Sequence, residues 1–328
     1  MRPFEYATPR SREQAVGLLG RNWNESAVLA GGTDLLALMK DDVVAPKRLV
    51  NIKQMGNYRD VKVEGNDLRI GALVTMGDLA ENPEVAKRFP ALHEALWEAA
   101  SPQIRNVATI GGNLCQRPRC WYFRNGMGLM PKDAGGQSLV LKGDNRYHAV
   151  LGNDGPAYFV SPSTVSPVLI AYGARVRIFG AGGPREVALE KFYRVPQSEN
   201  EREFDLQPNE VVTDVLVPLA DVRAGYYEVR QKEAFDWPMA SCAVALRMNG
   251  NTVQEARIVL GQVAPVPWIA TEAAQALAGK SVDEQSAMAA ANAALAAAKS
   301  LGHNKYKITV AKAAVKRALL NAAGHKQA

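Results

Sequence analysis

Two short segments, each with a pair of adjacent glycines, limit most strongly what this chain can fold into. Gly31-Gly32 ends an apolar run, and Gly111-Gly112 comes much later in the sequence. Adjacent glycines allow a sharp turn and a close approach of the backbone to a ligand, and successive N–H groups there can bind an anion. Each segment therefore predicts one side of a site for an extended, negatively charged ligand. The alternative for each segment is a simple tight turn. In the first segment, Asp34 would then cap the helix that follows.

Common catalytic and nucleotide-binding motifs are missing from the sequence. Neither glycine pair belongs to a GxGxxG pattern, and neither is followed by Lys and then Ser or Thr. Without a following Lys and Ser or Thr, a Walker loop is excluded. Without a GxGxxG pattern, a dinucleotide Rossmann fingerprint has no support. No nucleophile elbow, HExxH motif or paired-carboxylate motif occurs either. An enzyme without such groups takes its chemistry from a cofactor.

The order of apolar patterns predicts an α+β protein of two parts. A strand, a glycine turn, a helix and a second strand follow one another within residues 1–55, and strands and helices continue to about residue 180. A sheet and then a helical array follow, with the helices beginning at residue 271. We place the domain boundary near residue 180. The patterns predict strands at residues 168–178, 211–218, 241–248 and 257–263, and a long loop at residues 125–157.

The basic excess of the chain lies in its last 28 residues. The sequence has 39 basic and 33 acidic residues, a net charge of +6, and residues 301–328 contain six basic residues and no acidic one. The first 300 residues are therefore neutral overall, which argues against a general nucleic-acid binder. A solvated face of one terminal helix, or a docking surface for an acidic partner subunit, explains the excess.

Cysteine content and hydropathy exclude several other classes of protein. Cys115, Cys120 and Cys242 are too few for a disulfide framework and fit a reducing compartment. Cys115 and Cys120 lie five residues apart without the further ligands that a metal site needs. We expect no membrane span, because the Ala-rich residues 287–298 are too short to cross a bilayer. The first residues lack the apolar core of a secretory signal.

Three motifs, taken in order, resemble a known family. They are similar to those of the FAD-binding medium subunit of molybdenum hydroxylases, the xanthine dehydrogenase and carbon monoxide dehydrogenase group, and the resemblance covers essentially the whole chain. It implies FAD held between two α/β subdomains, residues 1–56 and 57–180, followed by a C-terminal domain, residues 181–328, of a small antiparallel sheet and a helix bundle. The motifs are Ala30-Gly31-Gly32-Thr33-Asp34-Leu35-Leu36, Leu68-Arg69-Ile70-Gly71-Ala72 and Ala108-Thr109-Ile110-Gly111-Gly112-Asn113-Leu114, with the later stretches 227–238 and 261–267.

The resemblance also assigns residues to the FAD site. The first glycine segment would hold the diphosphate through its backbone, and the second would contact it from the other side. Lys232 matches a basic residue near the flavin, with Arg230 as its competitor. The family's Pro-Ser-Asp motif appears as Pro162-Ser163-Thr164, which lacks the carboxylate. The expected FAD-binding residues are Val28, Leu29, Ala30, Gly31, Gly32, Thr33, Asp34, Leu35, Leu36, Thr109, Gly112, Asn113 and Lys232.

One part of the chain is most similar to a subgroup of this family. Residues 119–123 and 145–149 resemble the aldehyde oxidoreductase and hydroxybenzoyl-CoA reductase flavoprotein subunits, which carry an inserted loop with a four-iron, four-sulfur cluster on four cysteines. Cys120 matches one ligand position, but residues 121–160 contain no cysteine. Such clusters need thiolate ligands. We therefore expect that the loop persists and the cluster is absent.

The implied function is electron transfer within a larger enzyme. In the family a large subunit with molybdopterin hydroxylates the substrate, and a small subunit with two [2Fe–2S] clusters passes the electrons on. FAD then delivers them to an acceptor such as NAD⁺, a quinone or oxygen. A free-standing FAD-dependent oxidase, and a scaffold subunit that has lost FAD, are the alternatives. We expect a cytoplasmic protein, or a periplasmic one exported together with a partner.

Overall fold

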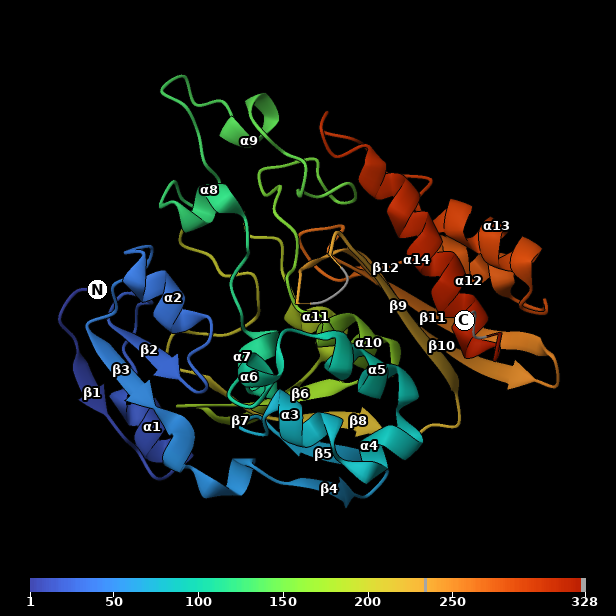
Figure 1. Cartoon of the computed structure of the whole chain (residues 1–328). Coiled ribbons are helices and arrows are strands. Elements are labelled where there is room, and N and C mark those ends of the chain that lie inside the picture. The colour runs from blue at the N-terminus through green and yellow to red at the C-terminus, as the bar shows by residue number, and fades with distance from the viewer. Residues whose placement is uncertain (233–234, 326–328) are drawn as a thin grey trace.

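The chain folds around three β-sheets that follow one another along the sequence (Figure 1). The computed structural model describes residues 1–232 and 235–325. Glu233 and Ala234, within the stretch 227–238, and Lys326, in the basic terminus, lie outside the described residues. In Figure 1 the first sheet lies at the left, the second at the centre and the third at the right, where helices cover it.

The first sheet is parallel and carries the first glycine segment. Strand β3 (Arg48–Asn51) lies between β1 (Glu5–Ala7) and β2 (Ser26–Leu29). Helix α2 (Leu35–Lys40) connects β2 to β3, so the predicted strand–helix–strand unit is confirmed. In such units ligands bind beyond the carboxyl ends of the strands, where the turn between β2 and α2 lies.

The second sheet is antiparallel, and its strand order does not fit a boundary at residue 180. Strands β7 and β8 come after residue 180, yet β8 pairs with both β5 and β6 and β7 pairs with β6. A boundary at residue 180 would divide this sheet. We propose instead that the domains meet between β8 and β9, near residues 219–222. The strands, in sheet order, are β4 (Val61–Glu64), β5 (Asp67–Gly71), β8 (Val211–Pro218), β6 (Arg175–Gly180) and β7 (Gly183–Ala188).

The prediction of a strand over residues 168–178 is wrong for its first half. Helix α10 (Val165–Ala171) occupies that part, and strand β6 begins only at Arg175. Every residue of α10 is buried, so the segment has no polar face. A short helix that is apolar all round gives the same sequence pattern as a buried strand. The helix packs against the third sheet and against α5 (Pro90–Glu98).

The third sheet is antiparallel, and three helices cover it, which confirms the expected C-terminal architecture. The strand predicted at residues 211–218 is the central strand of the second sheet, and those predicted at residues 241–248 and 257–263 lie within the third. Figure 1 shows α14 lying across β9 and β10. The elements are β9 (Arg223–Arg230), β10 (Pro238–Asn249), β11 (Thr252–Gly261), β12 (Trp268–Ile269), α12 (Thr271–Leu277), α13 (Glu284–Ala294) and α14 (Tyr306–Ala322).

Short helices occupy most of the connections. Several of them pack on the second sheet, where Ile70, Leu92, Val176 and Val215 share one apolar core. Within the part of the chain that the structure describes, each helix is too short or too polar to cross a bilayer. The remaining helices are α1 (Arg12–Leu18), η1 (Ile52–Gln54), η2 (Gly56–Tyr58), α3 (Met76–Ala80), α4 (Pro83–Arg88), α6 (Pro102–Arg105), α7 (Ile110–Leu114), α8 (Trp121–Arg124), α9 (Leu139–Lys142) and α11 (Leu189–Phe192).

The basic residues of α14 do not form one solvated face. Lys307 is buried, and its ammonium group donates hydrogen bonds to the backbone carbonyls of Tyr147, His148 and Gln262. Lys316 forms an ion pair with Glu284. The expectation of a solvated face is therefore wrong for Lys307, whose side chain fastens α14 to the loop before residue 150. A docking surface for an acidic partner stays a prediction for the exposed remainder.

We predict that replacing Gly225 by alanine weakens the contact between α14 and the third sheet. A Cβ at Gly225 would collide with the backbone carbonyl oxygen of Ala318 and lie 2.6 Å from the backbone nitrogen of Ala322. Overpacking of this kind typically lowers the free energy of unfolding by about 1–3 kcal/mol. Gly182→Ala is the matched control, because its Cβ would meet no atom within 4 Å. Urea denaturation of both variants tests this, and equal midpoints would contradict it.

Candidate functional site

A cleft of about 600 Å³ runs between the first sheet and the segment that leads into β10. Its walls include the turn between β2 and α2, residues 98–101 at the end of α5, the start of α7 and residues 235–238. Pockets of this volume commonly bind small molecules and cofactors. The walls come from distant parts of the sequence, so folding alone brings the two glycine segments together.

The first glycine segment offers backbone N–H groups to the cleft. Gly32 has a φ of +77°, which L side chains rarely adopt, and a Cβ on Gly31 would collide with the backbone of Val107. Both glycines are therefore required by the turn itself. The N–H groups of Gly32, Thr33 and Asp34 donate to no atom in the described part of the chain. Three successive free N–H groups form an anion-binding concavity.

The second glycine segment contributes room rather than free N–H groups. Thr109 caps α7, and its hydroxyl oxygen accepts a hydrogen bond from the Gly112 N–H at 3.1 Å. The N–H of Gly111 donates to the Ala72 carbonyl. A Cβ on Gly111 would lie 2.8 Å from the Ala72 Cβ, whereas a Cβ on Gly112 would meet only the Thr109 hydroxyl, at 3.0 Å. Gly111 is thus needed for packing, and Gly112 leaves space in the cleft.

Asn113 uses its side chain to hold the cleft together. Its amide nitrogen lies 3.4 Å from the Met76 sulfur, and its amide oxygen accepts a hydrogen bond from the Ser163 hydroxyl at 2.6 Å. Ser163 precedes Thr164, which also lines the cleft. The Pro-Ser-Thr segment is therefore fixed to the second glycine segment through Ser163, while Thr164 presents its side of the wall.

Asp34 is a bridge between two segments rather than a helix cap. No side-chain cap hydrogen bond forms at the start of α2. One carboxylate oxygen accepts a hydrogen bond from the backbone N–H of Arg117 at 2.8 Å. The other pairs with Arg119 at 2.8 Å and Arg124 at 2.7 Å. The alternative interpretation of a capping aspartate is wrong, and the first glycine segment is instead fastened to residues 117–124.

The cleft contains charged and aromatic residues that the sequence did not assign to it. Arg119 stacks on the ring of Trp237 at 4.5 Å. Burial lowers the pKa of Arg119 to about 10, and Asp34 opposes this shift, so the guanidinium stays charged at neutral pH. Glu98 and Glu228 also line the cleft. Three arginines and three aromatic residues lie within residues 117–124 of the sequence, and this clustering is the signal that could have found Arg119.

Most of the expected FAD-binding residues line this cleft, and three do not. Leu29 and Leu36 pack in an apolar cluster beneath the turn. Lys232 is exposed and lies outside the cleft wall, where its backbone N–H donates to Asp236. Its competitor, Arg230, is bonded to Glu98. The flavin-side role of Lys232 stays a prediction. The expected residues that line the cleft are Val28, Ala30, Gly31, Gly32, Thr33, Asp34, Leu35, Thr109, Gly112 and Asn113.

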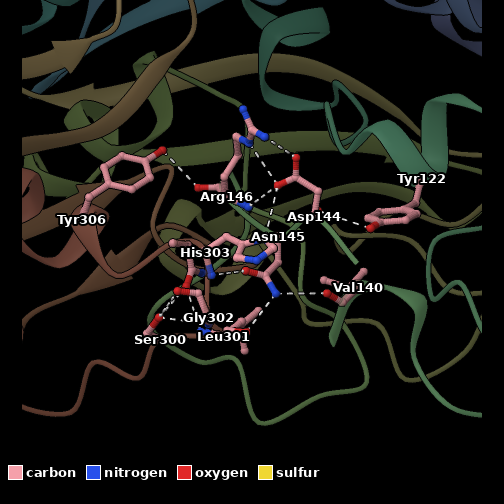
Figure 2. A network of polar contacts seen from close by, with 11 residues as sticks. Tyr122, Val140, Asp144, Asn145, Arg146, Ser300, Leu301, Gly302, His303 and Tyr306 are labelled. Atoms are coloured by element: carbon pink, nitrogen blue, oxygen red, sulfur yellow. Dashed lines mark hydrogen bonds and ion pairs between the residues drawn. The ribbon is translucent and has the colours of Figure 1, made fainter. Parts of the chain in front are cut away.

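The loop that resembles the cluster-bearing insertion is fixed by a polar network. Figure 2 shows Asn145 at the centre of this network. Its amide nitrogen donates to the carbonyls of Val140 and Leu301, and its amide oxygen accepts the N–H of His303. The hydroxyl of Tyr306 donates to the Arg146 carbonyl. Asn145 is nearly inaccessible to solvent, so the loop is joined firmly to the start of α14.

Cys120 has a histidine as its neighbour in this loop. Its sulfur lies 3.2 Å from the His148 Nε2 atom. Burial raises the pKa of the Cys120 thiol and lowers the pKa of His148 to about 4, so both side chains are neutral at pH 7. Among the described residues, no group of three or more His, Cys, Asp or Glu side chains is placed to hold a metal ion. The absence of an iron–sulfur cluster stays a prediction.

Comparison with known proteins identifies the family. Residues 2–220 match the family described as the FAD binding domain in molybdopterin dehydrogenase. Residues 225–322 match the CO dehydrogenase flavoprotein C-terminal domain. This chain belongs to the flavoprotein family that these two domains describe. The expected resemblance and its cofactor, FAD, are confirmed.

Relatives of this flavoprotein family align over nearly all of the chain. The carbon monoxide dehydrogenase medium chain of Hydrogenophaga pseudoflava is 33% identical over 321 residues, which cover 96% of each chain. The aldehyde oxidoreductase FAD-binding subunit PaoB of Escherichia coli K12 is 32% identical and covers 95% of this chain and 96% of its own. A solved structure of carbon monoxide dehydrogenase from H. pseudoflava, lacking the Mo-pyranopterin moiety, superposes with a TM-score of 0.77 at 32% identity, covering 100% of this chain and 99% of the other.

The cleft of this flavoprotein fits FAD in two independent respects. The free N–H groups of Gly32, Thr33 and Asp34 suit a diphosphate, which accepts hydrogen bonds and carries negative charge. The space beside Gly112 would be filled by any side chain larger than hydrogen. Both features lie in the same cleft, so an extended cofactor can contact both glycine segments.

We predict that Asp34→Ala destabilises the fold as well as the cleft. The substitution leaves the guanidinium groups of Arg119 and Arg124 without their carboxylate partner, and these side chains are only 28% and 16% exposed. Removing one partner of a partly buried ion pair should lower the free energy of unfolding by about 2 kcal/mol or more. The control, Asp154→Ala, removes a pair with Lys299 that is 77% and 69% exposed and should cost about 1 kcal/mol or less. Chemical denaturation that ranks the two variants in the opposite order would contradict the prediction.

Proposed function

We propose that this chain is the FAD-binding electron-transfer subunit of a heteromeric molybdenum hydroxylase. It takes electrons from [2Fe–2S] clusters of a small partner subunit, while a large partner subunit with molybdopterin hydroxylates the substrate. The observation that carries the proposal is the cleft itself, which brings both glycine segments together. The names of the relatives, a carbon monoxide dehydrogenase medium chain and an aldehyde oxidoreductase FAD-binding subunit, support the assignment to such a complex.

The residues of this chain bind and orient the cofactor. Bound FAD supplies the redox chemistry, since it accepts and releases electrons. The N–H groups of Gly32, Thr33 and Asp34 hold the diphosphate, and Gly112 leaves room for the part of the cofactor that passes the second segment. Asp34 and its arginine partners keep the two walls at a fixed separation. No acid–base group is needed for electron transfer, which agrees with the lack of catalytic motifs.

No specific observation favours either of the two alternative functions. A free-standing oxidase with a covalently bound flavin needs a reactive histidine or cysteine at the cofactor. Cys115 lines the cleft, but burial raises its pKa to about 12 and keeps it a thiol, which is a poor nucleophile. Within the described residues, no histidine lines the cleft. A scaffold that has lost FAD would have no need for the free N–H groups and the open space beside Gly112.

The partners and the subcellular location follow from the proposed complex. The final acceptor is NAD⁺, a quinone or oxygen. We propose a cytoplasmic location, with co-export to the periplasm on a partner as the alternative. We propose that no nucleic acid takes part, because the basic excess is confined to the last 28 residues and two of these, Lys307 and Lys316, already have protein partners.

We predict that the purified chain carries FAD that is released on denaturation. Hydrogen bonds to the diphosphate hold the cofactor without a covalent bond, so acid or heat should set it free. The measurement is the visible absorbance spectrum before denaturation, followed by chromatography of the supernatant. Flavin that stays attached to the denatured chain would favour the free-standing oxidase. A colourless protein that cannot be reconstituted with FAD would overturn the proposal in favour of the scaffold.

We predict that Gly112→Leu impairs FAD binding while the fold is kept. Gly112 has an ordinary helical conformation in α7 and lines the cleft, and its Cβ would meet only the Thr109 hydroxyl, so the backbone tolerates a side chain there. The dissociation constant for FAD should rise at least tenfold, a loss of about 1.4 kcal/mol. Gly182→Leu, on an open turn outside the cleft, is the matched control. Titration of apoprotein with FAD tests the prediction, and an unchanged affinity with an unchanged melting temperature would contradict it.

A further inference from the structure

One carboxylate in the cleft wall, that of Glu228, is not among the residues that the proposed function assigns to the cofactor. Glu228 lies on β9 and lines the cleft together with Glu98, yet its side chain is only 4% exposed. One of its oxygens, Oε2, accepts a hydrogen bond from the buried Tyr226 hydroxyl at 2.5 Å. The other, Oε1, is inaccessible to solvent and has no hydrogen-bond partner among the described residues. A buried carboxylate with one oxygen left without a hydrogen bond is costly in its charged form.

The charges around Glu228 act in opposite directions on its ionised form: Arg230 favours it, whereas Glu98 and Glu94 disfavour it. From β9 itself, the Nε atom of Arg230 lies 3.3 Å from Oε1, but the other guanidinium nitrogens are bonded to Glu98. From α5, the carboxylates of Glu98 and Glu94 both repel a charge on Glu228. From α14, Arg317 stacks on Tyr227, whose side chain points to the opposite face of the strand.

These surroundings set the protonation of Glu228 near neutral pH. Burial is the main cause that raises the pKa of Glu228 to about 7, and Tyr226 and Arg230 oppose it. A carboxyl group with this pKa is partly protonated at pH 7. Any negative charge that appears nearby in the cleft will raise its pKa further, because a like charge disfavours the ionised form.

We propose that Glu228 takes up a proton when FAD bound in the cleft is reduced, and returns it when FAD is reoxidised. This inference rests on the proposed function and places the redox-active ring at the end of the cleft that holds Glu228. Reduction brings two electrons, delivered one at a time by a one-electron donor such as a reduced iron–sulfur cluster. Together with these two electrons the cofactor takes up one proton, so its net charge becomes more negative by one. A second proton passes from solvent to the Glu228 carboxylate and neutralises that charge. On reoxidation both electrons pass to the acceptor and both protons return to solvent.

The pH dependence of the midpoint potential of bound FAD tests the inference. For a two-electron couple, each additional proton taken up makes the potential fall by a further ~30 mV for every tenfold drop in proton concentration. Glu228 is protonated in both redox states well below pH 7, so wild type and Glu228→Gln should have equal slopes there. Above pH 7 the wild-type potential should fall more steeply, and the two curves should separate.

Two further variants make the titration decisive. Glu84→Gln is the control, because Glu84 forms an exposed ion pair with Arg88 on α4, outside the cleft. It should follow the wild-type curve at every pH. Tyr226→Phe removes the hydroxyl that donates to Oε2 and keeps the ring, so the steep region should move to higher pH. This variant keeps the test decisive even if Glu228→Gln fails to retain FAD.

The outcomes separate this inference from the function on which it rests. Wild-type protein that binds no FAD overturns the proposed function, and this inference with it. Two outcomes overturn this inference but leave the proposed function intact. One is a plot of midpoint potential against pH with the same slope for wild type and Glu228→Gln from pH 6 to pH 9. The other is a Tyr226→Phe plot that coincides with that of wild type. An infrared carbonyl band of a protonated carboxylic acid that grows on reduction with dithionite, and is missing in Glu228→Gln, is the independent supporting result.

Discussion

The ion pairs of Asp34 with Arg119 and Arg124 are the contact on which the cleft depends. The first glycine segment belongs to a small three-stranded sheet, and residues 117–124 lead into a long loop. The apolar cluster that joins Leu38 of α2 to Phe123 and Phe159 supports the same contact. The carboxylate is mostly shielded from solvent, so its attraction to the guanidinium groups is screened far less than in a surface pair. The same residue also keeps Arg119 on the ring of Trp237 in the cleft wall.

The sequence correctly predicts that the two glycine segments lie at one site, but it does not predict the different structural role of each segment. Gly32 and Gly111 each belong to a pair of adjacent glycines, yet Gly32 adopts a left-handed φ and Gly111 packs against Ala72. Backbone hydrogen bonds account for this difference: the N–H of Gly111 is satisfied by the Ala72 carbonyl, whereas that of Gly32 stays free. Such a difference depends on which strand lies beside the turn, and a single sequence does not contain that information.

The remaining discrepancies come from tertiary contacts that no local pattern reveals. Helix α10 is buried on all sides and therefore looks like a strand, and β8 joins the second sheet across a gap of many residues. Lys307 reads as a solvated lysine from its basic neighbours, but three carbonyls surround its ammonium group. Glu228 and Glu98 lie far apart in the chain and meet only in the cleft wall. Family resemblance, rather than periodicity, supplied the cofactor and the overall plan.

The N–H groups after Gly31 are the atoms that we propose to hold the diphosphate of FAD. A crystal structure of the chain with FAD bound is the most direct test. We expect phosphate oxygens within hydrogen-bond distance of the backbone nitrogens of Gly32, Thr33 and Asp34, with the cofactor passing beside Gly112. A diphosphate bound elsewhere, with these three N–H groups facing solvent, would contradict it.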